Sequence, residues 1–218
     1  AKIAFFFAAG CTVVLKPAPE TPWCGLALGR LVTEHTDIPA GVFNVVTSSD
    51  PAIGELLTGD PRVDMVSFTG STATGRRVMA AASTNVTKVF LELGGKSASI
   101  VLDDVADFGL AAATAAFGTA TVAGQGCALT TRVLLPRSRY EEGVDAIAEM
   151  MAAMTPGDPT DPGTMMGPLI SDRQWQRVND YVRSAEADGA RVVCGGGRPS
   201  AIPDGHFFDM TLLADVTA

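Results

Sequence analysis

Histidine and basic side chains are scarce in this chain of 218 residues, and each shortage excludes a class of function. Lysine and arginine number 16 against 24 aspartates and glutamates. The resulting net charge of −8 argues against nucleic acid or an anionic membrane as a partner, since both require a basic face. The histidines, His35 and His206, have no supporting sequence context, so a cysteine hydrolase that depends on histidine is disfavoured.

Long apolar runs and paired cysteines are also missing. No apolar run approaches the ~20 residues that span a bilayer, and the longest, Ile3–Ala9, lacks the features of a secretory signal. The four cysteines form no CxxC pair and no zinc-type spacing with histidine, so we expect no metal site and a reduced, cytoplasmic setting. Cys11, Cys24 and Cys194 are expected to be small buried side chains.

Apolar residues make up 47% of the chain, enough for a substantial core, and the first half alternates strand-like and helix-like segments. This alternation predicts an α/β fold with a parallel sheet covered by helices, in which both faces of the strands are buried. The expected strands and the helices between them are Thr12–Lys16, Glu20–His35, Val42–Thr47, Pro51–Thr58, Met65–Thr69, Ser71–Ala82 and Lys88–Leu93.

The pattern changes after Gly94 and Gly95, where glycine permits a sharp turn, and we place a domain boundary there, between residues 1–93 and 94–218. Asp172 is the expected cap of the last helix. The strands and helices expected in the second part are Ser97–Leu102, Ala106–Val122, Arg132–Leu135, Arg139–Met154, Asp172–Asp188, Arg191–Cys194 and Phe207–Leu213.

Cys127 is the leading candidate for a chemical role. It lies in the stretch AGQGCALTTR, where Gly124 and Gly126 keep the approach open and let backbone N–H groups turn toward a bound oxygen. A thiolate is the nucleophilic form of cysteine, and Glu92 offers a carboxylate base. The pair describes a covalent mechanism that needs no histidine. The alternatives are a buried structural cysteine and a solvated carboxylate at a strand end.

Two further segments suit a nucleotide. The stretch FTGST at 68–72 joins a strand to a helix, so Gly70 allows close approach to the backbone while the helix N-terminus and the Ser71 hydroxyl suit a phosphate. The alternative is an ordinary turn with Ser71 as N-cap, and no GxGxxG fingerprint is present. Lys16 ends the first strand, at the edge of such sheets where ligands bind.

Together these segments resemble the NAD(P)-dependent aldehyde dehydrogenase superfamily, and the likeness covers nearly the whole chain. The resemblance implies an aldehyde dehydrogenase-like fold, with a Rossmann-like dinucleotide-binding part in residues 1–93 and part of an α/β catalytic domain in residues 94–218. The other matching segments, in the family's order, are Thr12–Pro17, Gly41–Val46, Gly157–Pro159 and Gly167–Ser171.

The resemblance implies oxidation of an aldehyde to a carboxylic acid. Cys127 would attack the aldehyde carbon to form a thiohemiacetal, hydride loss to the nicotinamide would leave a thioester, and Glu92 would activate the water that hydrolyses it. Lys16 would hold the adenosine ribose. The remaining residues assigned to the cofactor site are Thr69, Gly70, Ser71, Leu93 and Gly94.

A few positions at which this sequence differs from the family's pattern bear on the choice of cofactor and acyl acceptor. NAD is favoured, with NADP left open, because Asp50 would repel a 2′-phosphate although Pro19 replaces a carboxylate that often holds the ribose. The family's oxyanion asparagine, nicotinamide-ribose glutamate and oligomerisation strand are missing, so an impaired member that only binds a nucleotide or a partner is an alternative. A CoA-acylating semialdehyde dehydrogenase is another, and Glu92 argues against it. Val122 stands where an asparagine is common, and the full-length form is expected to be a homo-oligomer.

Overall fold

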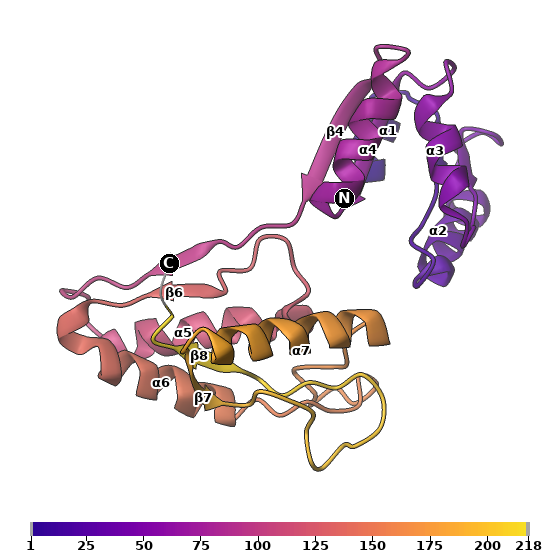
Figure 1. The fold of residues 1–218 in the computed structure, drawn as a ribbon. Coiled ribbons are helices and arrows are strands. Elements are labelled where there is room, and N and C mark those ends of the chain that lie inside the picture. Colours follow the sequence, from indigo (N-terminus) through magenta and orange to yellow (C-terminus); the bar gives the residue numbers. More distant parts are fainter. Residues whose placement is uncertain (1, 217–218) are drawn as a thin grey trace. The chain divides into compact units, whose positions relative to one another are not determined.

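The computed structural model describes residues 2–216 and divides into two compact units, Ala1–Leu93 and Gly94–Ala218 (Figure 1). Residue 1 and residues 217–218, which fall within the two predicted domains, lie outside the described residues. The division coincides with the glycine pair that begins at Gly94. The dinucleotide-binding and catalytic roles given to the two parts stay predictions.

Parallel strand pairs flanked by helices make up the first unit. β1 pairs with β2, and β3 pairs with β4 over six residues, from Met65 opposite Lys88 to Gly70 opposite Leu93. The predicted parallel pairing is therefore present, and the α/β class is confirmed. The elements are α1 (Lys2–Ala8), β1 (Val13–Leu15), α2 (Pro22–His35), β2 (Phe43–Val45), α3 (Pro51–Gly59), β3 (Met65–Gly70), α4 (Thr72–Ser83) and β4 (Lys88–Leu93).

The strands of the first unit differ from the prediction in two respects. The described residues form separate two-stranded sheets instead of one sheet. Their apolar side chains are also not buried on both faces. Val14 of β1 is 51% exposed and Phe90 of β4 is 48% exposed. The reason lies in the layering of β3 and β4. Leu93 packs against Gly75 of α4, so alternate side chains face that helix, while Phe90 belongs to the opposite face.

Helix starts in the first unit follow short-range polar signals. The Asp50 carboxylate accepts a hydrogen bond from the backbone N–H of Ala52 at 2.9 Å and caps α3. The Ser71 hydroxyl accepts from the backbone N–H of Thr74 at 3.2 Å and caps α4. α2 has Pro22 in its first turn, where the missing N–H costs nothing. α1 was not predicted as an element.

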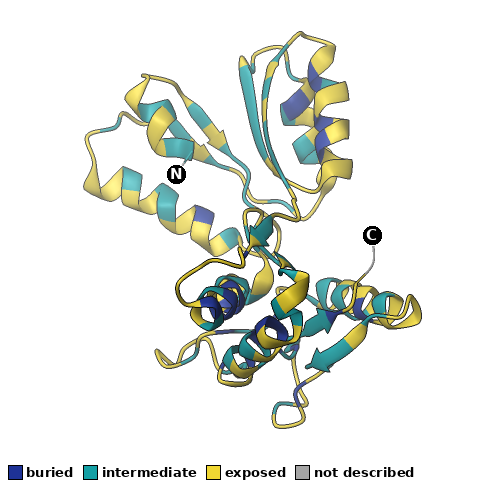
Figure 2. Cartoon of the chain, turned by 90° about the vertical axis from the view of Figure 1, so that its left-hand side faces the viewer, coloured by how far each residue is buried: buried dark blue, intermediate teal, exposed yellow. Residues whose placement is uncertain are grey.

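The second unit is built on two packed helices. Its elements are β5 (Ala98–Ile100), α5 (Phe108–Ala120), η1 (Thr121–Gly124), β6 (Arg132–Leu134), η2 (Arg137–Arg139), α6 (Tyr140–Ala152), α7 (Asp172–Ala187), β7 (Arg191–Cys194) and β8 (Leu212–Ala214). Three alanines of α5, Ala112, Ala116 and Ala120, let α6 approach closely and join Ile147 in the main core cluster. Figure 2 shows that buried residues concentrate in the helices of this unit.

Two predictions for the second unit are wrong. Ser171, not Asp172, caps α7, because its hydroxyl accepts from the backbone N–H of Gln174. The strand expected at Phe207–Leu213 is confined to Leu212–Ala214, antiparallel to β7. Its first half instead makes loop contacts, in which the Thr211 hydroxyl donates to the carbonyl of Asp209 and accepts from a backbone N–H. Within residues 2–216, every helix is too short or too polar to cross a bilayer.

Candidate active site

Cys127 lies on an exposed loop of the second unit, between η1 and β6. The turn that leads into this loop has an unusual backbone, since Val122, Ala123 and Gly124 have φ values of 54°, 53° and 72°. Consecutive left-handed residues reverse the chain at the end of α5. The thiol is thereby presented outside the helical core, as a nucleophile requires.

Two glycines near Cys127, Gly95 and Gly126, lie close to other atoms of the loop. A side chain at Gly95 would meet the carbonyl oxygen of Cys127 at 3.1 Å, and one at Gly126 would come within 2.7 Å of the Leu129 side chain. Gly126 therefore has a packing role besides the openness predicted for it. The absence of a Cβ at Gly95 lets the start of the second unit lie against the backbone of Cys127.

Glu92 lies in β4 of the first unit, where it is half-buried and directly opposite Thr69 of β3. Leu93 packs on α4, so strand alternation places the Glu92 side chain on the other face of the pair, with Phe90. Thr69 shares that face as the cross-strand neighbour of Glu92. Glu92 belongs to the first unit and Cys127 to the second.

The predicted phosphate turn joins β3 to α4. Gly70 ends β3, and a Cβ there would come within 2.5 Å of the Phe68 ring, so only glycine fits without moving that ring. Ser71 then caps α4, a helix of 12 residues whose first N–H groups point toward the turn. The cap interpretation of Ser71 is correct: its hydroxyl oxygen accepts from the backbone N–H of Thr74 and also lies 3.0 Å from the Thr74 hydroxyl. Gly94, after β4, faces open space.

Lys2 is a residue of this site that the sequence analysis missed. Its ammonium group donates to the Thr69 hydroxyl at 2.8 Å and to the Phe68 carbonyl at 3.3 Å, and it lies 5.5 Å from the centre of the Phe90 ring. These contacts place a positive charge on the Glu92 face of the β3–β4 pair, beside the turn at Gly70 and Ser71. A separation of 67 positions between the partners gave no local pattern by which to predict this contact.

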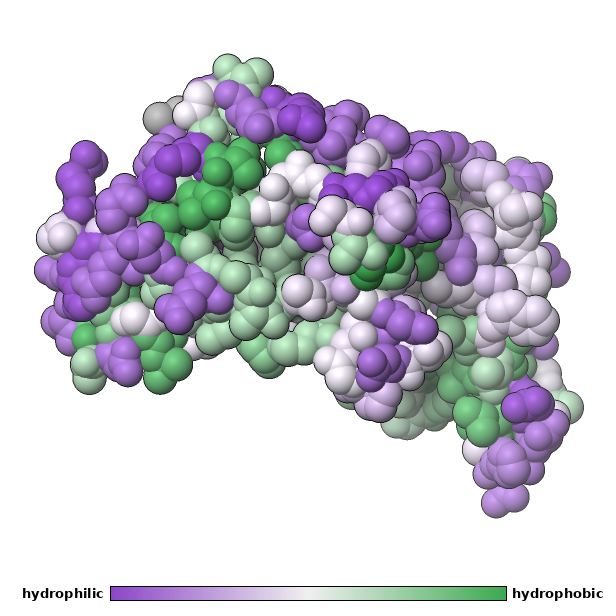
Figure 3. Space-filling view, turned by 90° about the horizontal axis from the view of Figure 1, so that it is seen from below, coloured by the Kyte–Doolittle hydropathy of each residue, from purple (hydrophilic) through white to green (hydrophobic). Residues whose placement is uncertain are grey.

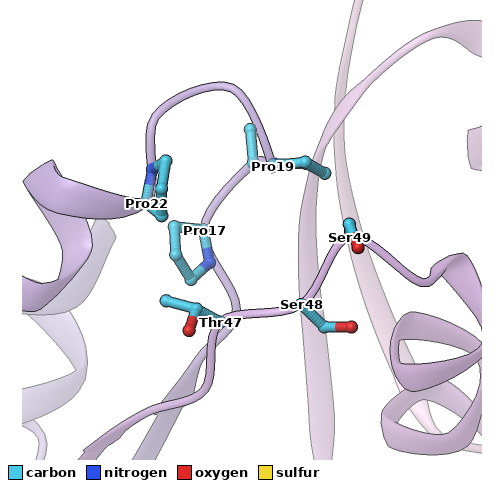
Figure 4. Close-up of a pocket in the computed structure, with 7 residues that line it drawn as sticks. Pro17, Pro19, Pro22, Thr47, Ser48 and Ser49 are labelled. Atoms are coloured by element: carbon cyan, nitrogen blue, oxygen red, sulfur yellow. The ribbon is translucent and has the colours of Figure 1, made fainter.

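A hollow of about 220 Å³ lies at the carboxyl ends of β1 and β2 (Figure 4). Three prolines form one side of it and the segment after β2 the other. Lys16 borders it, with its ammonium group donating to the Pro17 carbonyl at 2.9 Å. Ligands bind at this edge of parallel strands in α/β proteins. The lining residues are Pro17, Ala18, Pro19, Pro22, Thr47, Ser48 and Ser49.

The cysteines are more exposed than expected. Cys11 and Cys24 are exposed, as Cys127 is, and Cys194 is half-buried, so the prediction of buried side chains is wrong for the first two. Exposure alone therefore does not single out Cys127. Its position in the loop that follows the left-handed turn of residues 122–124 does. Among residues 2–216, no group of three or more histidine, cysteine, aspartate or glutamate side chains is arranged to hold a metal ion.

Comparison with known proteins gives a consistent result. A family model described as "Aldehyde dehydrogenase family" matches residues 1–218. The chain is 42% identical over 218 residues to a 3-succinoylsemialdehyde-pyridine dehydrogenase of a Pseudomonas species, covering 99% of this chain and 45% of that protein. It is also 42% identical over 211 residues to the NADP(+) succinate-semialdehyde dehydrogenase of Escherichia coli, covering 97% and 43%.

Solved structures agree in fold. An aldehyde dehydrogenase of Mycobacterium tuberculosis complexed with NAD+ is similar with a TM-score of 0.89 and 46% identity, covering 96% of this chain and 43% of that one. An aldehyde dehydrogenase mutant of Pseudomonas syringae complexed with NAD+ and octanal has a TM-score of 0.93 and 37% identity, covering 96% and 43%. The chain thus spans less than half the length of the relatives that it matches.

Proposed function

Because this chain belongs to the aldehyde dehydrogenase family, we propose that it carries the nucleophile and much of the cofactor site of an enzyme that oxidises an aldehyde to a carboxylic acid with NAD. The observation that carries the proposal is the placement of Cys127: an exposed thiol in the loop that follows the left-handed turn of residues 122–124, next to a glycine that lies against its carbonyl. That arrangement suits a nucleophile and gives a structural cysteine no shelter.

The proposed chemistry is covalent. The thiolate of Cys127 adds to the aldehyde carbon, forming a C–S bond and a thiohemiacetal oxyanion that backbone N–H groups of the loop can stabilise. Bound NAD would supply the hydride acceptor that the conversion of this intermediate into a thioester requires. Glu92 then takes a proton from water, the water oxygen adds to the acyl carbon, and the C–S bond breaks to release the acid and the thiolate.

The residues of the first unit fit a dinucleotide. Lys16 and the hollow at the ends of β1 and β2 suit the adenosine ribose, and Gly70 and Ser71 suit the pyrophosphate because the N-terminus of α4 favours negative charge. Thr69, Leu93 and Gly94 complete the proposed site. The ammonium group of Lys2, held by the Thr69 hydroxyl, adds positive charge beside the phosphates.

NAD is proposed as the cofactor in preference to NADP because a negative charge, that of Asp50, lies near the hollow at the ends of β1 and β2. Asp50 follows Ser48 and Ser49 of the lining and is held in place as the cap of α3. A fixed carboxylate there opposes a 2′-phosphate by like-charge repulsion. The Escherichia coli relative is named for NADP(+), so Asp50→Ser should shift the ratio of NADP to NAD usage upward if this reasoning holds.

A second candidate function is CoA-dependent acylation, and Glu92 separates it from hydrolysis. We propose hydrolysis, since the half-buried Glu92 of β4 offers a carboxylate that can take a proton from water. We further propose a homo-oligomer in the cytoplasm. Apolar pairs such as Ile100 and Leu134, opposite each other in β5 and β6 and 65% and 47% exposed, support association. Figure 3 shows that hydrophobic residues reach the molecular surface in several places on one face.

The test combines thiol labelling with turnover. Limiting iodoacetamide and peptide mapping should label Cys127 faster than Cys11 and Cys24, which are also exposed and serve as internal controls. NAD should change the rate at Cys127 alone, and NADH should form with propanal. Equal labelling of the three thiols, unaffected by NAD, would instead support a chain without a formed site. Acyl-CoA in place of acid, when CoA is supplied, would favour the second candidate.

A further inference from the structure

The turn before Cys127 requires support from the residues around it. Val122 and Ala123 both have left-handed backbones, and a β-branched residue in that region is a genuine outlier that persists only where its surroundings hold it. The Val122 side chain is 67% exposed, so packing of that side chain does not hold the turn. Contacts made by neighbouring residues must do so.

Gln125 makes such contacts with both ends of its carboxamide. Its backbone N–H and its side-chain Nε2 each donate to the Val122 carbonyl at 3.1 Å, which closes the left-handed turn. Its Oε1 accepts a hydrogen bond from the backbone N–H of Ile170 at 3.0 Å. One side chain therefore links the turn to a segment 45 positions further along the chain.

The segment reached by Gln125 is firmly anchored. Leu169, one residue earlier, is 7% exposed, packs with Val182 and Phe208, and donates its N–H to the His206 carbonyl at 3.0 Å. One residue later, α7 begins at its cap. Ala123 of the turn packs against this same cluster. The turn is thus fixed at two points, one apolar and one polar.

We propose that Gln125 is a positioning residue for the Cys127 nucleophile. Its carboxamide holds the left-handed turn against the start of α7. This contact fixes the direction of the backbone that leads to Cys127, two residues later. The inference rests on the proposed role of Cys127 as nucleophile. A glutamine is suited to this link because it donates and accepts at once, whereas a carboxylate can only accept.

The structural arm of the test is amide hydrogen exchange. Gln125→Ala should speed exchange about fivefold in peptides covering both 122–127 and 169–171, the factor expected for one hydrogen bond of ordinary net strength. Gln125→Glu keeps the acceptor, so it should preserve protection of the Ile170 N–H and lose it in the turn. Gln176→Ala, on the exposed face of α7, is the matched control and should change neither peptide.

The functional arm measures kcat and KM separately, with NAD and propanal. Loss of the link should lower kcat about tenfold or more, since small displacements of a reacting group have large effects on rate, while the KM for NAD stays within about twofold. A residue that served stability alone would change the melting temperature and leave kcat per folded molecule unaltered. Gln125→Glu should retain an intermediate kcat.

Unchanged exchange at Ile170 in Gln125→Ala, or a normal kcat in spite of faster exchange, would overturn the proposal. If Gln125→Ala does not fold, the split pattern in Gln125→Glu decides the question alone. If the unsubstituted protein forms no NADH from any aldehyde, the proposed function fails. The exchange data then still show whether Gln125 holds the turn.

Discussion

Replacing Val122 by asparagine should stabilise the second unit. The Val122 backbone is left-handed, with φ 54° and ψ 33°, and its side chain is 67% exposed. Such a conformation costs an L-residue roughly 1–2 kcal/mol, and a β-branched one more than most. Asparagine tolerates the region because its short polar side chain bonds locally. The substitution Val122→Asn therefore relieves backbone strain and removes few packing contacts.

The expected gain is about 1 kcal/mol, because asparagine relieves only part of the cost. For a chain of this length, that corresponds to a rise of about 2–4 °C in the melting temperature. Val86 provides a second case, with φ 57° and 89% exposure in the first unit, and Val86→Asn should raise the stability of that unit by a similar amount. The two gains should add, since the sites lie in different units.

Trp175 fluorescence is a suitable assay, because this residue belongs to the second unit and packs against Phe208. Trp23, in the first unit and 79% exposed, is replaced by phenylalanine in the background. Val105→Asn is the control, since Val105 is partly exposed without a left-handed backbone, and it should bring no gain. A lower melting temperature for Val122→Asn, or equal changes at 122 and 105, would refute the argument from strain.

Three further predictions follow from packing and charge. Ile147→Ala should cost about 2–5 kcal/mol of unfolding free energy in urea titrations, because Ile147 is 2% exposed and packs in the core cluster between α5 and α6. Lys2→Met should raise the Kd for NAD in calorimetry and leave that for adenosine unchanged, because the ammonium group lies by Thr69 and the phosphate turn. Hydrogen bonding to the Arg62 side chain lowers the pKa of Asp60 from 3.8 to about 2, so Arg62→Gln should raise it again in NMR titration. The contribution of this pair to stability is present above pH 4 and is lost as pH falls through 2.

Sequence reasoning was most successful where local chemistry decides the structure. The bounds of β4 were predicted correctly, and Ser71 marks the start of α4 because capping acts over three or four residues. The motif around Cys127 correctly indicated an exposed loop. Family membership was also readable, since the order of motifs carries it.

The remaining features depend on contacts between distant residues. Lys2 donates a hydrogen bond to Thr69, and Gln125 accepts one from Ile170. No local sequence pattern predicts either pair. The left-handed backbone of Val122 runs against the preference of a β-branched residue, so propensity points the wrong way. The strand expected from Phe207 failed for a similar reason, because hydrogen bonds across the loop replaced a strand ladder.

The contact between Gly95 and the Cys127 carbonyl has a consequence for how this protein can vary. Any side chain at position 95 must displace the backbone that carries the thiol, since a Cβ would already stand 3.1 Å from that oxygen. In a library randomised at 94 and 95 and selected for aldehyde turnover, survivors should therefore keep glycine at 95. Position 94, whose Cβ would meet open space, should accept alanine and serine. The two adjacent glycines would then differ in the substitutions that they tolerate, although they are chemically identical.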